Sequence, residues 1–156
     1  GITRDGTFRK MEKTQWDAVL STNLDSVFNV TQQVLPGMTE RGWGRVINIS
    51  SVTLWLGKEH LLHYVSSKAG MIGFTRVLAR EVGAEGITVN AVAPGPTATA
   101  LFLDGKSPEL IERMAKMNPL ERLGTPEDIA AAVSFLVGPD GGWINGQVLR
   151  ANGGMV

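Results

Sequence analysis

The stretch VINIS, Val46 to Ser50, decides how the rest of the chain is interpreted. It is short, apolar and rich in β-branched residues, which is typical of a buried strand. A helix is predicted after it, over about Tyr64 to Val82, where glycines end the pattern. The run ITVNAVAP, Ile87 to Pro94, is predicted as a second strand and is closed by Pro94-Gly95. A strand, helix, strand unit indicates a parallel α/β sheet.

Further elements extend this unit in both directions. On the amino-terminal side we predict a helix over Gln15 to Leu35, with Thr14 as its N-cap and a weak end at Pro36-Gly37. On the other side, two helix starts and a weak final strand are predicted, at Ser107-Pro108, at Thr125-Pro126 with Asp128 completing a capping-box-like turn, and at Gln147 to Ala151. The fold class is therefore α/β, in one domain over residues 1–156.

Composition excludes several functional classes. Fifteen basic residues balance fifteen acidic ones, so no global charge favours nucleic acid or an anionic membrane. The absence of cysteine excludes disulfides, thiolate metal sites and a cysteine nucleophile. No apolar run is long enough to span a bilayer and no signal peptide opens the chain, so we expect a cytoplasmic protein. The chain starts at Gly1 without a methionine, which suggests that it is part of something longer.

The only tyrosine of the chain, Tyr64, is followed four residues later by Lys68. On a helix these side chains share a face, and a nearby ammonium favours the phenolate. Such a tyrosine can pass a proton to or from a carbonyl or alcohol oxygen. However, a lysine at this spacing is also expected by chance at about 6%. The pair alone is therefore a moderate signal.

Its surroundings strengthen this signal. Ser51 follows the strand that precedes Tyr64, and ligands of open α/β sheets bind beyond the carboxyl ends of strands. The loop after Pro94 lies at the same rim. The predicted helix also carries small residues that permit close approach of a backbone or a flat cofactor, or simple helix packing: Ser66, Ser67, Ala69, Gly70 and Gly73.

At this point the sequence resembles the short-chain dehydrogenase/reductase family. The resemblance rests on Ser51 with Tyr64-x-x-x-Lys68 thirteen residues later, on NISS and ITVNAVAPG, and on the closing NGG, Asn152 to Gly154. It covers essentially the whole chain. It implies an oxidoreductase that uses NAD or NADP and has a catalytic tetrad.

Each member of that tetrad has a counterpart here. The resemblance implies that Asn23 holds a proton-relay water and that Ser51 orients the substrate oxygen. Tyr64 is the implied general acid in reduction and the base in oxidation, and Lys68 lowers its pKa and binds the nicotinamide ribose. Thr99 matches the position that contacts the nicotinamide carboxamide. The full set of implied cofactor-binding residues is Tyr64, Lys68, Pro94, Gly95, Thr97 and Thr99.

The chain departs from the family in one large respect. A glycine-rich turn between a strand and a helix, which would hold the pyrophosphate, is not found. Gly1 instead matches the last residue of the family's Asn-Asn-Ala-Gly motif. The resemblance therefore implies the C-terminal portion of a Rossmann-like, doubly wound parallel sheet without its N-terminal strands. Weak cofactor binding is expected, and nothing in the sequence chooses between NAD and NADP.

The substrate is less well defined. Gly1 to Val52 resembles acetoacetyl-CoA and 3-oxoacyl-(acyl-carrier-protein) reductases, which implies a ketone or 3-oxoacyl thioester substrate, whereas the rest resembles only the broader family. Four apolar residues near Tyr64 are interpreted as a substrate pocket, a lid or a subunit contact: Trp55, Leu56, Leu61 and Leu62. His60 and His63 are assigned to a loop without a catalytic role. Asn48 and Asn90, in the strands, are interpreted as structural hydrogen-bonding groups.

Two functions remain open. One is a reductase with Tyr64 as the general acid. The other is a non-catalytic α/β fragment that acts only through self-association. The resemblance implies a homo-oligomer, a dimer or tetramer, formed through the helices over 15–35 and 64–82. The strand Val46–Ser50 is also expected to expose an unpaired edge. No metal, nucleic acid or membrane partner is predicted.

Overall fold

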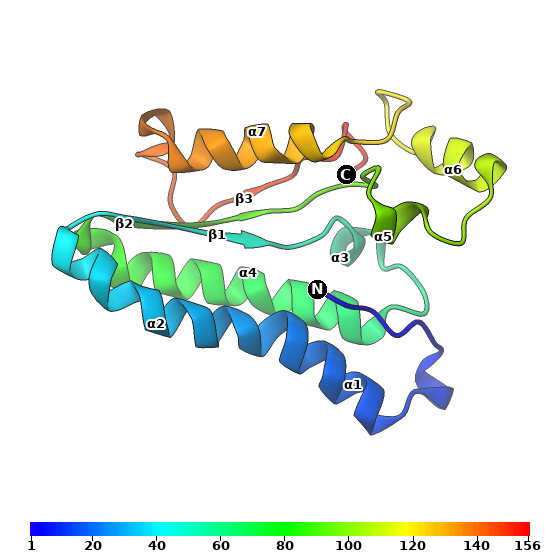
Figure 1. Ribbon diagram of the computed structural model, residues 1–156, viewed down its shortest axis with the longest axis horizontal. Helices are drawn as coiled ribbons and strands as arrows, with labels where there is room; N and C mark the ends of the chain where they lie inside the picture. The colour runs from blue at the N-terminus through cyan, green and yellow to red at the C-terminus, as the bar shows by residue number, and fades with distance from the viewer.

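The computed structural model describes all residues from Gly1 to Val156 and has a layered α/β architecture (Figure 1). Its helices and strands are α1 (Lys13–Leu20), α2 (Ser26–Arg41), β1 (Gly44–Ile49), α3 (Thr53–Leu56), α4 (Leu62–Val82), β2 (Ile87–Val92), α5 (Ala100–Leu103), α6 (Pro108–Ala115), α7 (Pro126–Val137) and β3 (Val148–Leu149). Short helical turns add η1 (Phe8–Lys10), η2 (Ser21–Asp25), η3 (Gly83–Glu85) and η4 (Pro139–Gly141). Helices α2 and α4 pack on one face of the sheet, with α1 beside α4, and α7 packs on the other.

The sheet has three parallel strands in the order β1-β2-β3. β1 pairs with β2 along its whole length, with Gly44 opposite Ile87. β3 pairs only with the last part of β2, where Val92 lies opposite Leu149. The predicted α/β class and parallel sheet are confirmed. β1 begins two residues and ends one residue before the predicted strand, and β2 begins at Ile87 as predicted but ends two residues earlier. β1 has no partner strand on its other side, as expected.

The core lies between β1, β2 and α4. All six residues of β2 are buried, which explains why this strand is apolar without alternation. The largest buried cluster joins Val46, Ala79, Val82, Ile87 and Val89. Fully burying one such aliphatic side chain is worth about 1.5–3 kcal/mol, so this cluster fixes α4 on the sheet.

The amino-terminal helix differs from the prediction at both ends and in the middle. It begins at Lys13, where Glu12 and Gln15 form the capping box, so Thr14 is not its N-cap. The π-helical turn η2 separates α1 from α2. Helix α2 then continues through Pro36 to Arg41. Met38, just beyond the proline, packs against the core cluster, and this packing outweighs the hydrogen bond that proline cannot make.

The predicted helix starts near the carboxyl end are confirmed. The Ser107 hydroxyl accepts a hydrogen bond from the Leu110 amide at 3.3 Å at the start of α6. At the start of α7, Thr125 and Asp128 exchange side-chain to backbone hydrogen bonds of 2.8 and 3.2 Å. These local contacts satisfy amides that a helix terminus otherwise leaves unpaired.

The two strand asparagines are structural, as interpreted. The Asn48 amide donates to the Thr75 hydroxyl on α4 at 2.9 Å. Asn90, which is completely buried, donates to the Ile144 carbonyl at 2.8 Å and accepts from the Gln147 amide at 3.0 Å. Asn90 therefore fixes the turn that leads into β3.

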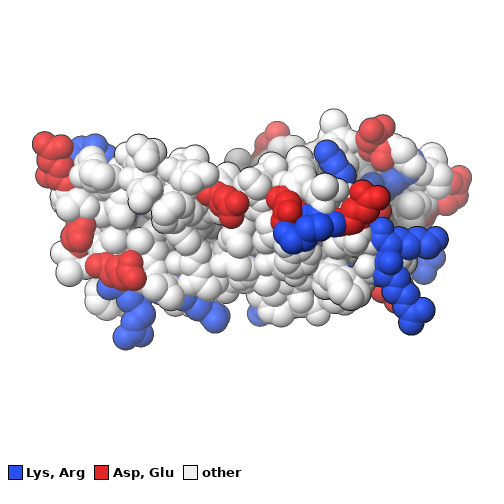
Figure 2. Space-filling model, turned by 90° about the horizontal axis from the view of Figure 1, so that it is seen from below, with Lys and Arg blue, Asp and Glu red and all other residues white.

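Surface charge follows the balanced composition. Basic and acidic side chains both occur at each end of the face shown in Figure 2, so neither sign covers that face. None of the helices combines the length and the apolar character that crossing a membrane requires.

Candidate active site

Tyr64 and Lys68 lie together on the first two turns of α4, at the carboxyl end of β1. The Lys68 ammonium donates a hydrogen bond of 2.7 Å to the carbonyl of Ile49, the last residue of that strand. The same nitrogen lies 5.7 Å from the centroid of the Tyr64 ring. The predicted helix face is therefore formed, and the strand end anchors its lysine.

Burial dominates the electrostatics of this pair. It raises the pKa of Tyr64 above its ordinary value, and a hydrogen-bonding interaction with the Ser51 hydroxyl opposes the rise. Burial also lowers the pKa of Lys68, which is only 6% exposed. Desolvation of the phenolate is the larger effect, so the pKa of Tyr64 is raised overall, and the predicted lowering of this pKa by Lys68 stays a prediction. Tyr64 keeps its proton at neutral pH, which is the form a general acid needs.

Ser51 lies in the short turn between β1 and α3 and is buried. Its oxygen accepts hydrogen bonds from the amide and the hydroxyl of Thr53, at 3.2 and 2.9 Å. Because both contacts use its lone pairs, the hydroxyl proton of Ser51 is left to donate. The residue caps the turn and also faces Tyr64.

Asn23 occupies the centre of η2 and is almost completely buried, at 2% exposure. Its side chain accepts from the Ile2 amide at 2.8 Å and donates to the Ile2 carbonyl at 2.9 Å. The second amide hydrogen goes to the Ser67 hydroxyl at 3.2 Å. Both side-chain donors are therefore engaged, and a water held by this residue would have to bind its backbone. Gly1 fits here because a Cβ would lie 2.6 Å from the Asn23 oxygen.

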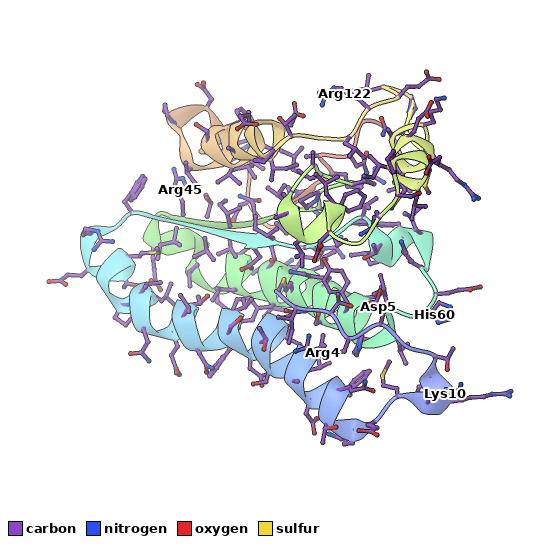
Figure 3. The ribbon with its side chains drawn as sticks, turned by 45° about the vertical axis from the view of Figure 1, so that its right-hand side comes forward. Arg4, Asp5, Lys10, Arg45, His60 and Arg122 are labelled. Carbon is purple, nitrogen blue, oxygen red and sulfur yellow. The ribbon has the colours of Figure 1, made fainter.

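His63 is not a loop residue, contrary to the sequence interpretation. It is the second residue of α4 and is completely buried, whereas His60 lies in the preceding loop with its side chain exposed. The His60 carbonyl accepts a hydrogen bond from the Gly6 amide at 3.0 Å. Figure 3 shows Arg4 and Asp5 on the amino-terminal segment, with His60 on the neighbouring loop at the same end of α4. The sequence did contain a signal for a structural role of His63. It stands directly before the predicted helix start, where backbone amides without helical partners need hydrogen-bond acceptors.

The predicted cofactor loop lies at the same rim of the sheet. The Pro94 carbonyl accepts from the Val52 amide at 3.0 Å, which joins this loop to the turn after Ser51. The Gly95 amide donates to the Ala151 carbonyl at 2.9 Å, beyond the end of β3. The carboxyl ends of all three strands therefore meet here, where open α/β sheets bind their ligands.

The two threonines of this loop are partly engaged. The Thr97 hydroxyl donates to the Gly95 carbonyl at 3.0 Å. The Thr99 hydroxyl accepts from the Phe102 amide at 3.3 Å as the N-cap of α5, and its own proton is left to donate. Thr99 therefore has a free donor for a carboxamide, whereas Thr97 is tied to its own loop.

A family model described as enoyl-(acyl carrier protein) reductase matches residues 1–156, the whole chain. The chain belongs to the short-chain dehydrogenase/reductase family. This confirms the resemblance that the serine, tyrosine and lysine motifs carry.

Curated members of this family have similar sequences. Nodulation protein G of Azospirillum brasilense is 49% identical over 155 residues. An acetoacetyl-CoA reductase of Allochromatium vinosum is 47% identical, and a 3-oxoacyl-(acyl-carrier-protein) reductase of Vibrio cholerae is 41% identical. Each alignment covers 99% of this chain and 63% of the relative. The chain therefore spans somewhat less than two thirds of the length of these family members, which is consistent with part of a Rossmann-like fold.

The four apolar residues near Tyr64 divide into two groups by exposure. Trp55, Leu56 and Leu62 are each about two-fifths exposed, at 41%, 39% and 43%. Leu61 is only 8% exposed and therefore does not line an open pocket. The Arg150 guanidinium lies 5.7 Å from the centroid of the Trp55 ring, so the end of β3 contacts α3 at this rim.

A separate cavity of about 240 Å³ lies among the loops beyond β2 and β3. Its polar lining includes Arg122, labelled in Figure 3, which pairs with Asp128 through contacts of 2.6 and 3.1 Å. Neither Tyr64 nor Ser51 lines it. The cavity is therefore separate from the Tyr64 and Ser51 side chains.

Proposed function

We propose that this chain carries the catalytic part of an NAD(P)-dependent carbonyl reductase that acts on a ketone or a 3-oxoacyl thioester. The observation that carries the proposal is a protonated, partly buried Tyr64 next to Ser51 and the buried ammonium of Lys68, at the carboxyl end of a parallel sheet. The names of the similar acetoacetyl-CoA and 3-oxoacyl reductases support this substrate class.

The residues present fit only one half of a nicotinamide dinucleotide. Lys68 and Thr99 have donors at the strand ends that suit the nicotinamide ribose and carboxamide. No glycine-rich turn connects a strand to a helix for the pyrophosphate. The nicotinamide supplies a hydride when bound. We expect this chain alone to hold NADH or NADPH with about millimolar affinity.

The chain's own residues have distinct roles in the proposed reduction. The Ser51 hydroxyl donates a hydrogen bond to the substrate oxygen and orients the carbonyl. The Tyr64 phenol donates its proton to that oxygen as negative charge develops there. The positive charge of Lys68 then stabilises the resulting phenolate, which is otherwise disfavoured by burial.

The test compares wild type with Tyr64→Phe, using a 3-oxoacyl thioester and millimolar NADPH or NADH. Phenylalanine cannot donate the proton, so the rate should fall by about 10²–10⁴-fold. Ser66→Ala, on the same helix and without a side-chain hydrogen bond, is the control and should keep the wild-type rate. Full activity of Tyr64→Phe would remove the tyrosine from the mechanism. A wild-type chain without any reduction would favour the non-catalytic alternative.

We also propose that the chain self-associates. The outer edge of β1 has no partner strand, and edges of this kind pair readily with other chains. Four large apolar side chains on α2 and α4 are between 43% and 62% exposed: Phe28, Val30, Val34 and Val77. Such exposure marks an interaction surface. Sedimentation at micromolar concentration should give a dimer or tetramer, and a stable monomer would refute the proposal.

A further inference from the structure

The first turn of α4 lacks an ordinary N-cap. A helix start leaves four backbone N–H groups without helical partners, and Ser, Thr, Asp or Asn at the N-cap satisfies one of them. Here the N-cap is Leu61, whose side chain has no acceptor. The amide of Tyr64 instead donates to Nδ1 of the neighbouring His63 at 2.8 Å. The imidazole therefore replaces the missing cap at the residue that carries the proposed general acid.

The second nitrogen of the same ring anchors a distant segment. Because Nδ1 accepts a hydrogen bond, the proton of the neutral ring is on Nε2. Nε2 lies 2.7 Å from the Arg4 carbonyl and donates to it. His63 has no exposed surface, so neither contact competes with water. The ring thus joins the amino-terminal segment to the start of α4.

These contacts belong to a continuous series of hydrogen bonds. The Tyr64 carbonyl accepts from the Ser67 hydroxyl at 2.7 Å. That hydroxyl accepts from the Asn23 amide at 3.2 Å, and Asn23 binds both backbone groups of Ile2. The series begins at Ile2 and returns to the same segment at Arg4, labelled in Figure 3. Both backbone polar groups of Tyr64 are therefore held by side chains that also tie down residues 2–4.

We propose that His63 is a positioning residue that holds the backbone of Tyr64 in place and locks the segment Ile2–Arg4 against α4. This rests on the proposed role of Tyr64, since a general acid must be held within hydrogen-bonding reach of the substrate oxygen. A displacement of about 1 Å is enough to cost about a hundredfold in rate. His63 itself does not contact the reacting atoms.

Two substitutions separate its two contacts. His63→Asn keeps an acceptor at the position of Nδ1 and loses the donor to Arg4. His63→Gln keeps a donor at the position of Nε2 and loses the acceptor for the Tyr64 amide. His63→Ala loses both. Circular dichroism and thermal unfolding establish whether each variant is folded. If His63→Ala does not fold, the comparison of His63→Asn with His63→Gln is sufficient to test the proposal.

The first measurement is hydrogen exchange of the Tyr64 amide by NMR. We expect His63→Gln to accelerate it by about three- to thirty-fold, the effect of losing a helix-cap acceptor, and His63→Asn to stay near wild type. The second is the alkaline absorbance titration of the phenol, which reports Tyr64 alone because the chain has one tyrosine. His63→Gln should move the pKa of Tyr64 down towards its ordinary value of 10.0, because the side chain becomes less buried.

Reduction kinetics give a third readout. His63→Gln should lower kcat with little change in KM, and His63→Asn should restore most of kcat. Equal behaviour of the Asn and Gln variants in exchange and titration would overturn the proposal. These two measurements need no cofactor or substrate, so they remain decisive even if Tyr64→Phe shows that the tyrosine is not the acid.

Discussion

The unit β1–α4–β2 and the outer segment Thr97–Leu123 are built in different ways. Every residue of β2 and seven residues of α4 are buried, whereas α5 and α6 contain no buried residue. Side chains in the first unit are fixed by long-range contacts, such as that of Lys68 with Ile49. The helices of the outer segment depend on local caps, Thr99 and Ser107.

We propose that this difference separates the residues of the proposed chemistry from those that select the substrate. The proposed acid, its lysine and its serine belong to the buried unit, where a shift of one side chain disturbs several others. The outer segment begins in the proposed cofactor loop and passes outside the core. Its sequence can therefore change without moving Tyr64. We infer that substrate preference depends mainly on this segment and on the exposed side chains Trp55 and Leu62.

The largest predicted effect tests the buried unit with a core truncation. Ile87→Ala removes a side chain that is 1% exposed from the main cluster and should cost about 2–5 kcal/mol of unfolding free energy, because a cavity remains. Leu110→Ala, on α6 and 42% exposed, is the matched truncation in the outer segment and should cost less than about 1 kcal/mol. Urea denaturation of both variants measures the two values. Equal losses would mean that the two regions are not built differently.

Sequence patterns were informative where a structure depends on local residues. The apolar runs Val46–Ser50 and Ile87–Pro94 predicted both long strands. Ser107 and Thr125 predicted the starts of two helices. The spacing of Tyr64 and Lys68 placed both side chains at one strand end. Each of these signals lies within a few residues of what it predicts.

Features that depend on contacts between residues distant in sequence were not predicted, or were predicted incorrectly. The π-helical turn around Asn23 is fixed by Ile2 and Ser67, far away in sequence. The acceptor role of His63 follows from the helix beginning at Leu62, two residues earlier than predicted. The direction of the Tyr64 pKa shift depends on burial, which spacing to a lysine does not report.

A smaller effect on stability is predicted for alanine substitutions at two glycines, Gly95 and Gly124, which lie at the two ends of the loop region after β2. A Cβ on Gly95 would lie 2.9 Å from the Asn152 Cα, so Gly95→Ala must displace backbone and should cost about 1–3 kcal/mol. On Gly124, which directly follows the outer segment, the nearest atom is the Thr97 hydroxyl oxygen at 3.4 Å. Gly124→Ala should therefore be neutral or stabilise by up to about 1 kcal/mol, because alanine restricts the unfolded chain. Thermal unfolding of both variants measures the two changes in stability. A larger loss for Gly124→Ala than for Gly95→Ala would contradict the rigid contact between Gly95 and Asn152.

The smallest predicted effect concerns the ion pair between Arg122 and Asp128, which ties the outer segment to α7. The hydrogen bonds from Arg122, followed by the Thr125 amide, hold the pKa of Asp128 well below its ordinary value of 3.8. Because the folded-state pKa is depressed, this contribution to stability is present above the ordinary pKa and is lost as pH falls through the lower folded-state value.

Asp128→Asn keeps an oxygen for the Thr125 amide but removes the charge, so it isolates the ion pair from the cap. The unfolding temperature of wild type should exceed that of the variant at neutral pH, and the gap should begin to narrow below pH 3.8 and close as pH falls through the lower folded-state pKa of Asp128. Added salt should also narrow the gap, because the pair is solvent-exposed and screened. Equal unfolding temperatures of wild type and variant at neutral pH would show that Asp128 acts through the cap alone. The outer segment would then be joined to α7 without any help from charge.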